Sequence, residues 1–173
     1  MALKHVLRYV KETLTFKLKY EKSDEHIIGY SDADWARDVE KCKSTFDFIF
    51  LLGKGAISWG CKKQAYVALS TMEVEYVSLS QATREAIWLR NLMCDLMQAP
   101  KKSITIYVDN QSCMALAKKP IFHKRTKHIN IQHHYIREVL DEGKIVLEYC
   151  PTEDMMANFL TKELGPLKHL KWP

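Results

Sequence analysis

Long apolar runs and closely paired cysteines are absent from this sequence. No stretch approaches the roughly 18 consecutive apolar residues of a membrane-spanning helix. The first residues are amphipathic and lack the continuous apolar core and cleavage site of a signal peptide. There is no CxxC pair, and the five cysteines are an odd number spread along the chain, which favours reduced thiols over a disulfide framework or a zinc site. These absences predict a cytosolic or nuclear protein without a membrane partner.

One long segment lacks acidic residues altogether. Between Asn110 and Arg137 there is no Asp or Glu, although the whole chain has 21 of them. A segment of one charge sign is typical of a surface that binds nucleic acid, and a solvated positive face without a ligand is the alternative. Charge alone does not separate the two. The candidate contacts are Lys118, Lys119, Lys124, Arg125 and Lys127.

The hydrophobic pattern predicts an α/β fold. Apolar residues at helical spacing predict helices, and alternating or continuous apolar runs between turn residues predict strands. The expected order β-β-β-α-β-α-α-β-α implies a mixed five-stranded sheet with helices on both faces. We expect strands at 27–32, 44–52, 55–60, 104–109 and 144–149, and helices at 71–98, 111–118, 129–141 and 153–163.

A shorter N-terminal piece precedes this body. Residues 2–14 have the apolar spacing of a helix, residues 15–20 alternate like a short strand, and residues 21–26 are polar and resemble a linker. We therefore expect an N-terminal segment (1–25), a main domain (26–165) and a C-terminal tail (166–173).

Three of the four tryptophans lie in or beside the predicted elements of the body. Trp88 falls in the middle of the long helix, next to its apolar stripe, and Trp35 and Trp59 lie in or near strands. We expect all three in the core rather than on a surface that stacks on bases.

Two aspartates stand where predicted strands end. Asp32 ends the first strand of the body, and Asp109 ends the first strand after the long helix. Either residue alone is more typical of a turn or a helix cap. If the two strands are neighbours, however, both carboxylates lie at one edge of the sheet, where the chemistry of such folds gathers.

The start of the long helix offers a third acid, and two glutamates compete for the role. Glu73 lies three residues after Ser70, the spacing of a capping box, and so has a sufficient structural role. Glu75 lies on the core-facing stripe, where a carboxylate is costly unless it is paired or bound to a cation. We therefore predict that Asp32, Glu75 and Asp109 form an oxygen-lined pocket for Mg²⁺ or Mn²⁺.

These acids lie within longer sequence blocks that follow one another in a specific order. Together the blocks resemble the RNase H domain of copia-type LTR retrotransposon polyproteins, over residues 27–165. Residues 1–20 resemble the tail of the reverse transcriptase that precedes it. The main blocks are GYSDADWA (29–36), GAISW (55–59), VALSTMEVEY (67–76), EAIWLR (85–90), YVDNQS (107–112), RTKHI (125–129), PTED (151–154) and LTK (160–162).

The resemblance implies an activity, cofactors and partners. The family hydrolyses the RNA strand of RNA–DNA hybrids with two Mg²⁺ ions, for which Mn²⁺ can substitute. Asp32, Glu75 and Asp109 fall on three of its metal-binding acids, in agreement with the choice of Glu75 over Glu73. The resemblance also implies contact with the reverse transcriptase domain of the same polyprotein. It further implies a cytoplasmic virus-like particle, with the nucleus as the alternative.

The resemblance adds a role for the residues that follow Asp109. Asn110, Gln111 and Ser112 begin a helix and so can cap it. In the family these positions line the minor groove of the hybrid, where small polar groups can bind the 2′-OH of RNA. Both roles stay open.

Three positions depart from the pattern of the family. The fourth metal-binding acid of the family, on the last helix, is replaced by Asn158, which offers a carbonyl oxygen without a charge. Asp154, one helical turn earlier, could supply the missing negative charge. Arg37 and Asp47 replace two glycines and would add strain if those turns need positive φ. We expect a ribonuclease H weakened at its fourth ligand. The alternatives are an inactive nucleic-acid-binding module and a structural partner that binds another protein through the apolar stripe of the N-terminal helix.

Overall fold

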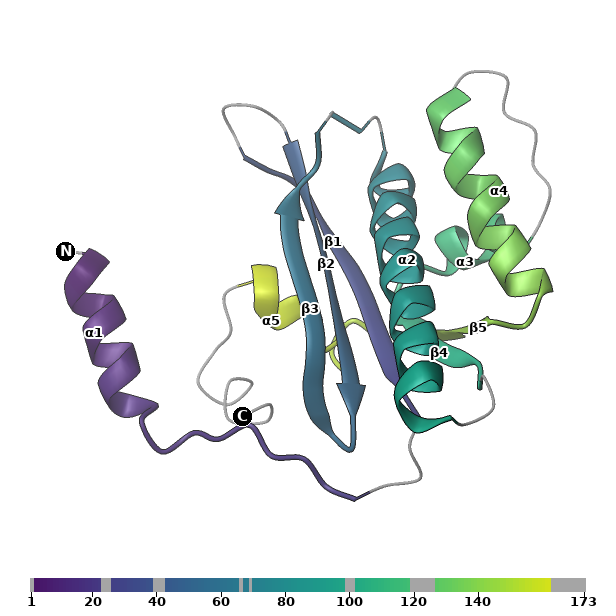
Figure 1. Cartoon of the computed structure of the whole chain (residues 1–173). Helices are drawn as coiled ribbons and strands as arrows, with labels where there is room; N and C mark the ends of the chain where they lie inside the picture. The colour runs from purple at the N-terminus through teal and green to yellow at the C-terminus, as the bar shows by residue number, and fades with distance from the viewer. Residues whose placement is uncertain are drawn as a thin grey trace.

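The computed structural model describes residues 2–22, 26–38, 43–65, 67–68, 70–98, 102–118 and 127–162. Its body is a five-stranded sheet flanked by helices (Figure 1). The strands are β1 (Ile28–Asp38), β2 (Lys43–Leu52), β3 (Gly55–Lys63), β4 (Ile104–Val108) and β5 (Ile145–Tyr149). The helices are α1 (Ala2–Glu12), α2 (Thr71–Met97), α3 (Gln111–Lys118), α4 (Lys127–Asp141) and α5 (Asn158–Thr161).

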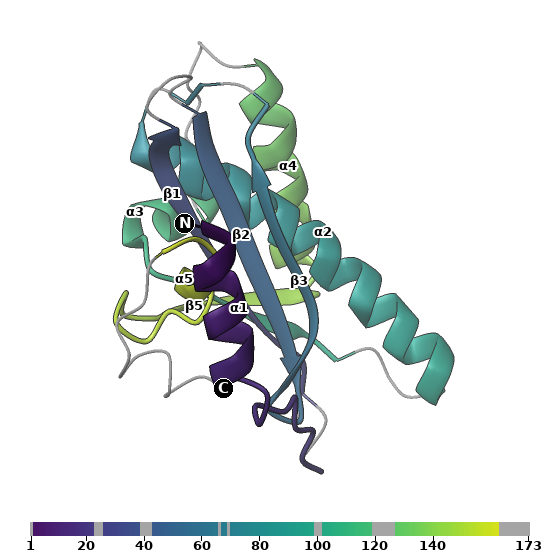
Figure 2. The ribbon, with the colours of Figure 1, turned by 90° about the vertical axis from the view of Figure 1, so that its left-hand side faces the viewer.

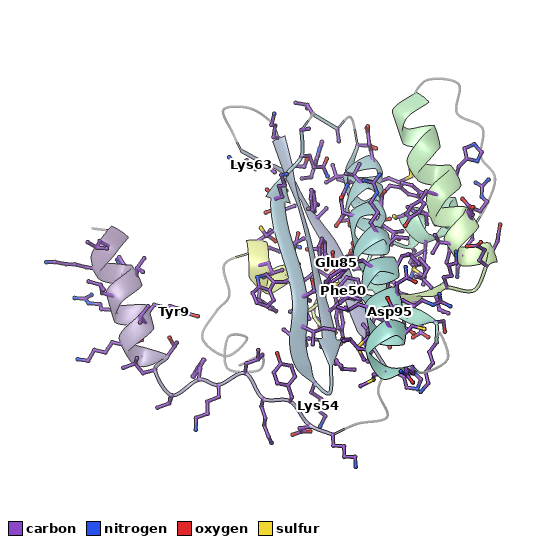
Figure 3. All side chains as sticks on the ribbon, in the orientation of Figure 1. Tyr9, Phe50, Lys54, Lys63, Glu85 and Asp95 are labelled. Carbon is purple, nitrogen blue, oxygen red and sulfur yellow. The ribbon has the colours of Figure 1, made fainter. Side chains whose placement is uncertain are left out.

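The sheet is mixed, and β1 lies at its centre. The spatial order is β3-β2-β1-β4-β5, with antiparallel pairing from β1 to β3 and parallel pairing of β4 with both β1 and β5. The β2–β3 hairpin turns through Gly53 and Lys54, both with positive φ, a turn that matches the twist of the strands. Lys54 lies at the tip of the hairpin (Figure 3). The predicted fold class and hairpin are therefore confirmed.

Helices cover both faces of the sheet. Side chains alternate along β2, so that Phe48 and Phe50 pack against α2 in the main core, whereas Ile49 points to the other face. Phe50 is fully buried between the sheet and α2 (Figure 3). On the other face, Ile49 and Met155 form a smaller core beneath α5. Figure 2 shows the same layers from the side.

Several expected elements differ from those observed. Residues 15–20 form no strand; the contacts here are isolated ones, such as the hydroxyl of Tyr20 donating to the carbonyl of Ala56. β1 continues past its apolar run to Asp38, because polar residues of β1 and β2 also pair in the ladder. The last helix is only α5, since residues 152–154 and 156–157 form turns. Figure 1 shows α1 apart from the sheet, and the predicted domain boundaries stay predictions.

The expectation of three core tryptophans is wrong. Trp35, Trp59 and Trp88 are 53%, 61% and 56% exposed. Trp59 lies on the edge strand β3, and Trp35 lies on the part of β1 that extends beyond its pairing with β4. The expected backbone strain is absent too. Arg37 and Asp47 lie inside strands, and neither has positive φ.

None of the helices in the described part of the chain combines the length and the apolar character that a membrane span requires.

Candidate metal centre

The candidate metal centre lies where β4 ends beside the longer strand β1. β4 pairs with β1 only as far as Val108 and Ser31, so β1 continues alone on that side. Asp109 follows the last residue of β4, and Asp32 follows the last paired residue of β1. The two carboxylates therefore come level with each other. Asp32 lies inside β1 rather than at its end, which corrects the expected strand boundary but keeps the two acids adjacent.

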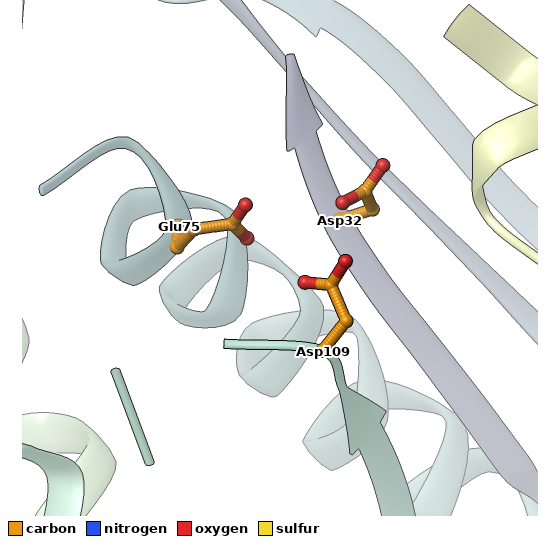
Figure 4. Close-up of side chains that lie close together, drawn as sticks. All are labelled: Asp32, Glu75 and Asp109. Atoms are coloured by element: carbon orange, nitrogen blue, oxygen red, sulfur yellow. The ribbon is translucent and has the colours of Figure 1, made fainter. Parts of the chain in front are cut away.

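The first turns of α2 bring the third carboxylate to the same place. The hydroxyl of Ser78 donates to the backbone oxygen of Asp32 at 2.6 Å and lies 3.0 Å from the hydroxyl of Ser31, which ties α2 to β1. Glu75 lies about one turn earlier on α2. Carboxylate oxygens of Asp32, Glu75 and Asp109 all lie within 4.8 Å of one another. Figure 4 shows the three side chains converging from three separate elements.

The two glutamates at the start of α2 have different roles in the structure. Ser70 is the N-cap of α2, and its hydroxyl accepts from the backbone N–H of Glu73 at 3.2 Å. The cap that the sequence predicted is therefore present. Glu75, and not Glu73, belongs to the carboxylate cluster.

Burial and mutual repulsion make this cluster electrostatically costly. Burial, together with the neighbouring carboxylates of Asp32 and Asp109, raises the pKa of Glu75 to about 9. Oε2 of Glu75 is buried and has no hydrogen-bond partner among the described residues. Burial also raises the pKa of Asp32, against the opposing effect of Lys162. A divalent cation fits this donor set, because it would favour the charged carboxylates and give the buried oxygen a ligand.

The fourth expected position, Asn158, is held by neighbours of the cluster. Its Nδ2 donates to the backbone oxygen of Thr152 at 2.8 Å, and its Oδ1 accepts from Nζ of Lys162. The hydroxyl of Thr152 donates to Oδ2 of Asp109, also at 2.8 Å. Asn158 is thus linked to the acids only through other side chains. Asp154 is exposed and precedes α5 in a turn, so the helical spacing that suggested it for the pocket does not exist.

Two ionisable residues next to the site, Lys162 and Asp47, were not assigned to it from the sequence. Nζ of Lys162 donates to Oδ2 of Asp32 at 2.7 Å. Asp47 lies opposite Asp32 in the β1–β2 ladder and is fully buried, and burial together with the charge of Asp32 raises its pKa to about 8. Its Oδ2 accepts from the hydroxyl of Thr161 at 3.2 Å. The available signals were a polar residue within an apolar strand and a lysine four residues after Asn158.

The expected nucleic-acid contacts are only partly described. Oδ1 of Asn110 accepts from the backbone N–H of Cys113 at 2.9 Å, so Asn110 caps α3. Helix capping was one of the two roles predicted for Asn110. Gln111, Ser112 and Lys118 are exposed on α3. Lys119, Lys124 and Arg125 lie outside the described residues, and Lys127 begins α4 without a described side chain. Nucleic-acid binding therefore stays a prediction.

Solved structures identify the fold. An RNase H isolated from compost, in complex with an RNA–DNA hybrid, matches with a TM-score of 0.55 at 12% identity over 78% of this chain and 92% of that one. The N-terminal RNase H domain of a Mycobacterium tuberculosis protein matches with a TM-score of 0.57 at 9% identity, over 86% and 99%. The prototype foamy virus protease–reverse transcriptase matches with a TM-score of 0.54 at 11% identity, over 89% and 21%. The chain has the fold of an RNase H domain.

The sequence relatives identify a narrower group of proteins than the solved structures do. The chain is 38% identical to the retrovirus-related Pol polyprotein from transposon TNT 1-94 of Nicotiana tabacum, over 93% of this chain and 12% of the relative. It is 37% identical to that of transposon RE1 of Arabidopsis thaliana, over 95% and 11%. No protein-family model matches the chain. These relatives confirm the resemblance to copia-type polyproteins, and the chain spans about an eighth of the length of the curated relatives it matches.

Proposed function

We propose that this domain hydrolyses the RNA strand of RNA–DNA hybrids with divalent cations held by Asp32, Glu75 and Asp109. One observation carries the proposal: three carboxylates from β1, α2 and the end of β4 lie within 4.8 Å of one another. A buried cluster of this kind is costly without a cation, and hard oxygen ligands suit Mg²⁺ or Mn²⁺. Two bound ions would supply an activated water and a charge that stabilises the leaving 3′ oxygen, with 5′-phosphate and 3′-hydroxyl products.

The protein's own residues hold this arrangement in place. Ser78 fixes the backbone of Asp32 against α2, and Thr152 fixes the side chain of Asp109 through its Oδ2. In this proposal Asn158 is a weak neutral ligand at the fourth position. Its Oδ1 accepts a hydrogen bond from Lys162, so a cation at this position would lie next to the ammonium group.

The substrate and partners are proposed from the comparisons and the charge pattern. A neighbour of the same fold was solved with an RNA–DNA hybrid, and another is part of a protease–reverse transcriptase chain. The acid-free segment 110–137 would contact phosphates of the hybrid. We propose that the domain works beside a reverse transcriptase domain of the same polyprotein in a cytoplasmic particle.

The direct test is cleavage of a labelled RNA–DNA hybrid with Mg²⁺ or Mn²⁺. Asp109→Asn should lower the rate of cleavage by more than about 100-fold. Removing a group that only hydrogen-bonds to a metal ligand already lowers activity by about 10- to 100-fold, and loss of a ligand itself should cost more. Asp95→Asn is the matched control, because Asp95 is an exposed acid on α2. Cleavage that survives both EDTA and Asp109→Asn would contradict the proposal.

A second candidate function is a hybrid-binding module without catalysis. The observation that favours it is the neutral Asn158 together with the ammonium group of Lys162 beside Asp32. If the protein binds the hybrid but cuts it at no concentration of Mg²⁺ or Mn²⁺, this second function replaces the first.

A further inference from the structure

Lys162 places a positive charge inside the proposed metal centre. Its Nζ lies 2.7 Å from Oδ2 of Asp32 and also donates to Oδ1 of Asn158. The Asp32 side chain is only 1% exposed, and that of Lys162 is 36% exposed. The ammonium group therefore reaches from the surface to a buried carboxylate that has few other ways to be neutralised.

The surroundings explain why the lysine stays there. Asn158 begins α5 and Lys162 is the residue that caps its end, so the two side chains come from opposite ends of one short helical turn. The carboxylates of Asp109 and Asp47 also act on its charge, in addition to that of Asp32. Among the described residues, no other ion pair involves a member of the carboxylate cluster.

We propose that Lys162 is a tethered cation that competes with a divalent ion for Asp32 Oδ2 and Asn158 Oδ1. This inference rests on the proposed metal centre and adds a property to it. An ammonium group and a divalent ion repel each other at such short range, so the ammonium group moves away when an ion binds on this side. Without ions, Lys162 stabilises the folded protein by compensating the charge of Asp32.

Cation binding itself tests the competition, without reference to catalysis. Titration with Mn²⁺, followed by calorimetry and by the electron paramagnetic resonance signal of free Mn²⁺, gives affinity and stoichiometry. Lys162→Met should bind Mn²⁺ at least about tenfold more tightly than wild type, which corresponds to about 1.4 kcal/mol, or should bind one more ion. Lys162→Arg keeps the charge and should remain close to wild type. Lys102→Met is the control, because Lys102 is exposed and precedes β4 at the end opposite Asp109.

Thermal unfolding separates competition from a purely structural role. In EDTA, Lys162→Met should unfold at a lower temperature than wild type, because Asp32 loses its partner. With saturating Mn²⁺ the deficit should disappear, since the ion replaces the lost charge. A deficit of the same size in both conditions would mean that Lys162 only supports the fold, and the proposal would be wrong.

The wild-type protein offers a second measurement that does not depend on how the variants fold. Acetylation of lysines by a succinimidyl ester, read by mass spectrometry, reports how accessible each amine is. Mn²⁺ should raise the labelling rate of Lys162 relative to that of Lys102, because the bound ion releases the ammonium group. An unchanged ratio at a concentration where Mn²⁺ binding has been measured would overturn the proposal.

The outcomes also distinguish this inference from the proposed function. If wild type and Lys162→Met bind Mn²⁺ with the same affinity and stoichiometry, only the role of Lys162 fails. If neither protein binds Mn²⁺, the metal centre of Asp32, Glu75 and Asp109 fails, and the competition fails with it.

Discussion

Restoring the fourth carboxylate is the sharpest perturbation of the proposed enzyme. Asn158→Asp adds a negative charge next to a site where Asp32, Glu75 and Asp109 supply at most three charges against the four of two divalent ions. We expect tighter cation binding and faster cleavage of RNA at low Mg²⁺, with a smaller gain at saturation. The physical reason is that the new carboxylate favours the cation-bound state over the cation-free one.

The structure sets the size of the gain. Unit charges about 4 Å apart interact by roughly 4 kcal/mol at an effective dielectric constant of 20, which is an upper limit here. One effect opposes it, because the new carboxylate would also pair with Lys162, which must be displaced. The amide of Asn158 donates to the backbone oxygen of Thr152 at 2.8 Å, and loss of that bond lowers the stability of the cation-free and the cation-bound protein alike, so it changes the cation affinity little. A net gain of about 1–2 kcal/mol, or roughly tenfold in cation affinity, follows.

The assay is the Mg²⁺ dependence of hybrid cleavage by wild type, Asn158→Asp and Asp154→Asn. Asp154 is exposed and lies in a turn before α5, so its substitution should change little and serves as a control for charge in the same loop. In EDTA, Asn158→Asp should be less stable than wild type, because the added carboxylate repels those already present. If Asn158→Asp needs more Mg²⁺ than wild type, the electrostatic reasoning is wrong. If Asp154→Asn abolishes cleavage, the missing charge comes from Asp154 instead.

Two further predictions concern pH and nucleic-acid binding. Without divalent ions, the free energy of unfolding should decrease as the pH rises from about 4.5 to about 9. The pKa values of Glu75 (about 9) and Asp47 (about 8) lie above the ordinary carboxyl values. In this pH range the folded state therefore binds more protons than the unfolded chain, and raising the pH favours unfolding. Urea unfolding across this range checks it: Mg²⁺ and the variant Glu75→Gln should each reduce the fall, and a constant stability in EDTA would contradict it. Replacing Lys124, Arg125 and Lys127 with Ala should weaken hybrid binding and lower the slope of log affinity against log salt by about two to three units if all three meet phosphate. An unchanged slope would show that the acid-free segment is only a solvated face.

Some features of the site could be predicted because they depend on short-range patterns. The capping box of Ser70 and Glu73 assigned one glutamate to the helix start, and the helical period assigned Glu75 to the buried face; both follow from the geometry of a single helix. The order of strands and helices restricted the sheet to few topologies. The acids at strand ends then pointed to the correct edge of the sheet.

Other features could not be predicted from the sequence, because they depend on where one strand lies or ends relative to its neighbours. The ladder decides that β1 continues past β4, which opens the edge where Glu75 reaches Asp32 from the opposite face. Exposure of Trp59 depends on β3 being an edge strand, which its own composition does not show.

The fold class and the identity of the three acids follow from the sequence, because periodicity, capping and strand order are local properties of the chain. The charge balance of the site depends on the tertiary structure. Asp32 meets Lys162 across 130 residues and faces Asp47 across the β1–β2 ladder. Such contacts are set by the packing of α5 on the sheet and by the pairing register, and a charge that is solvated in one register becomes a buried partner in another.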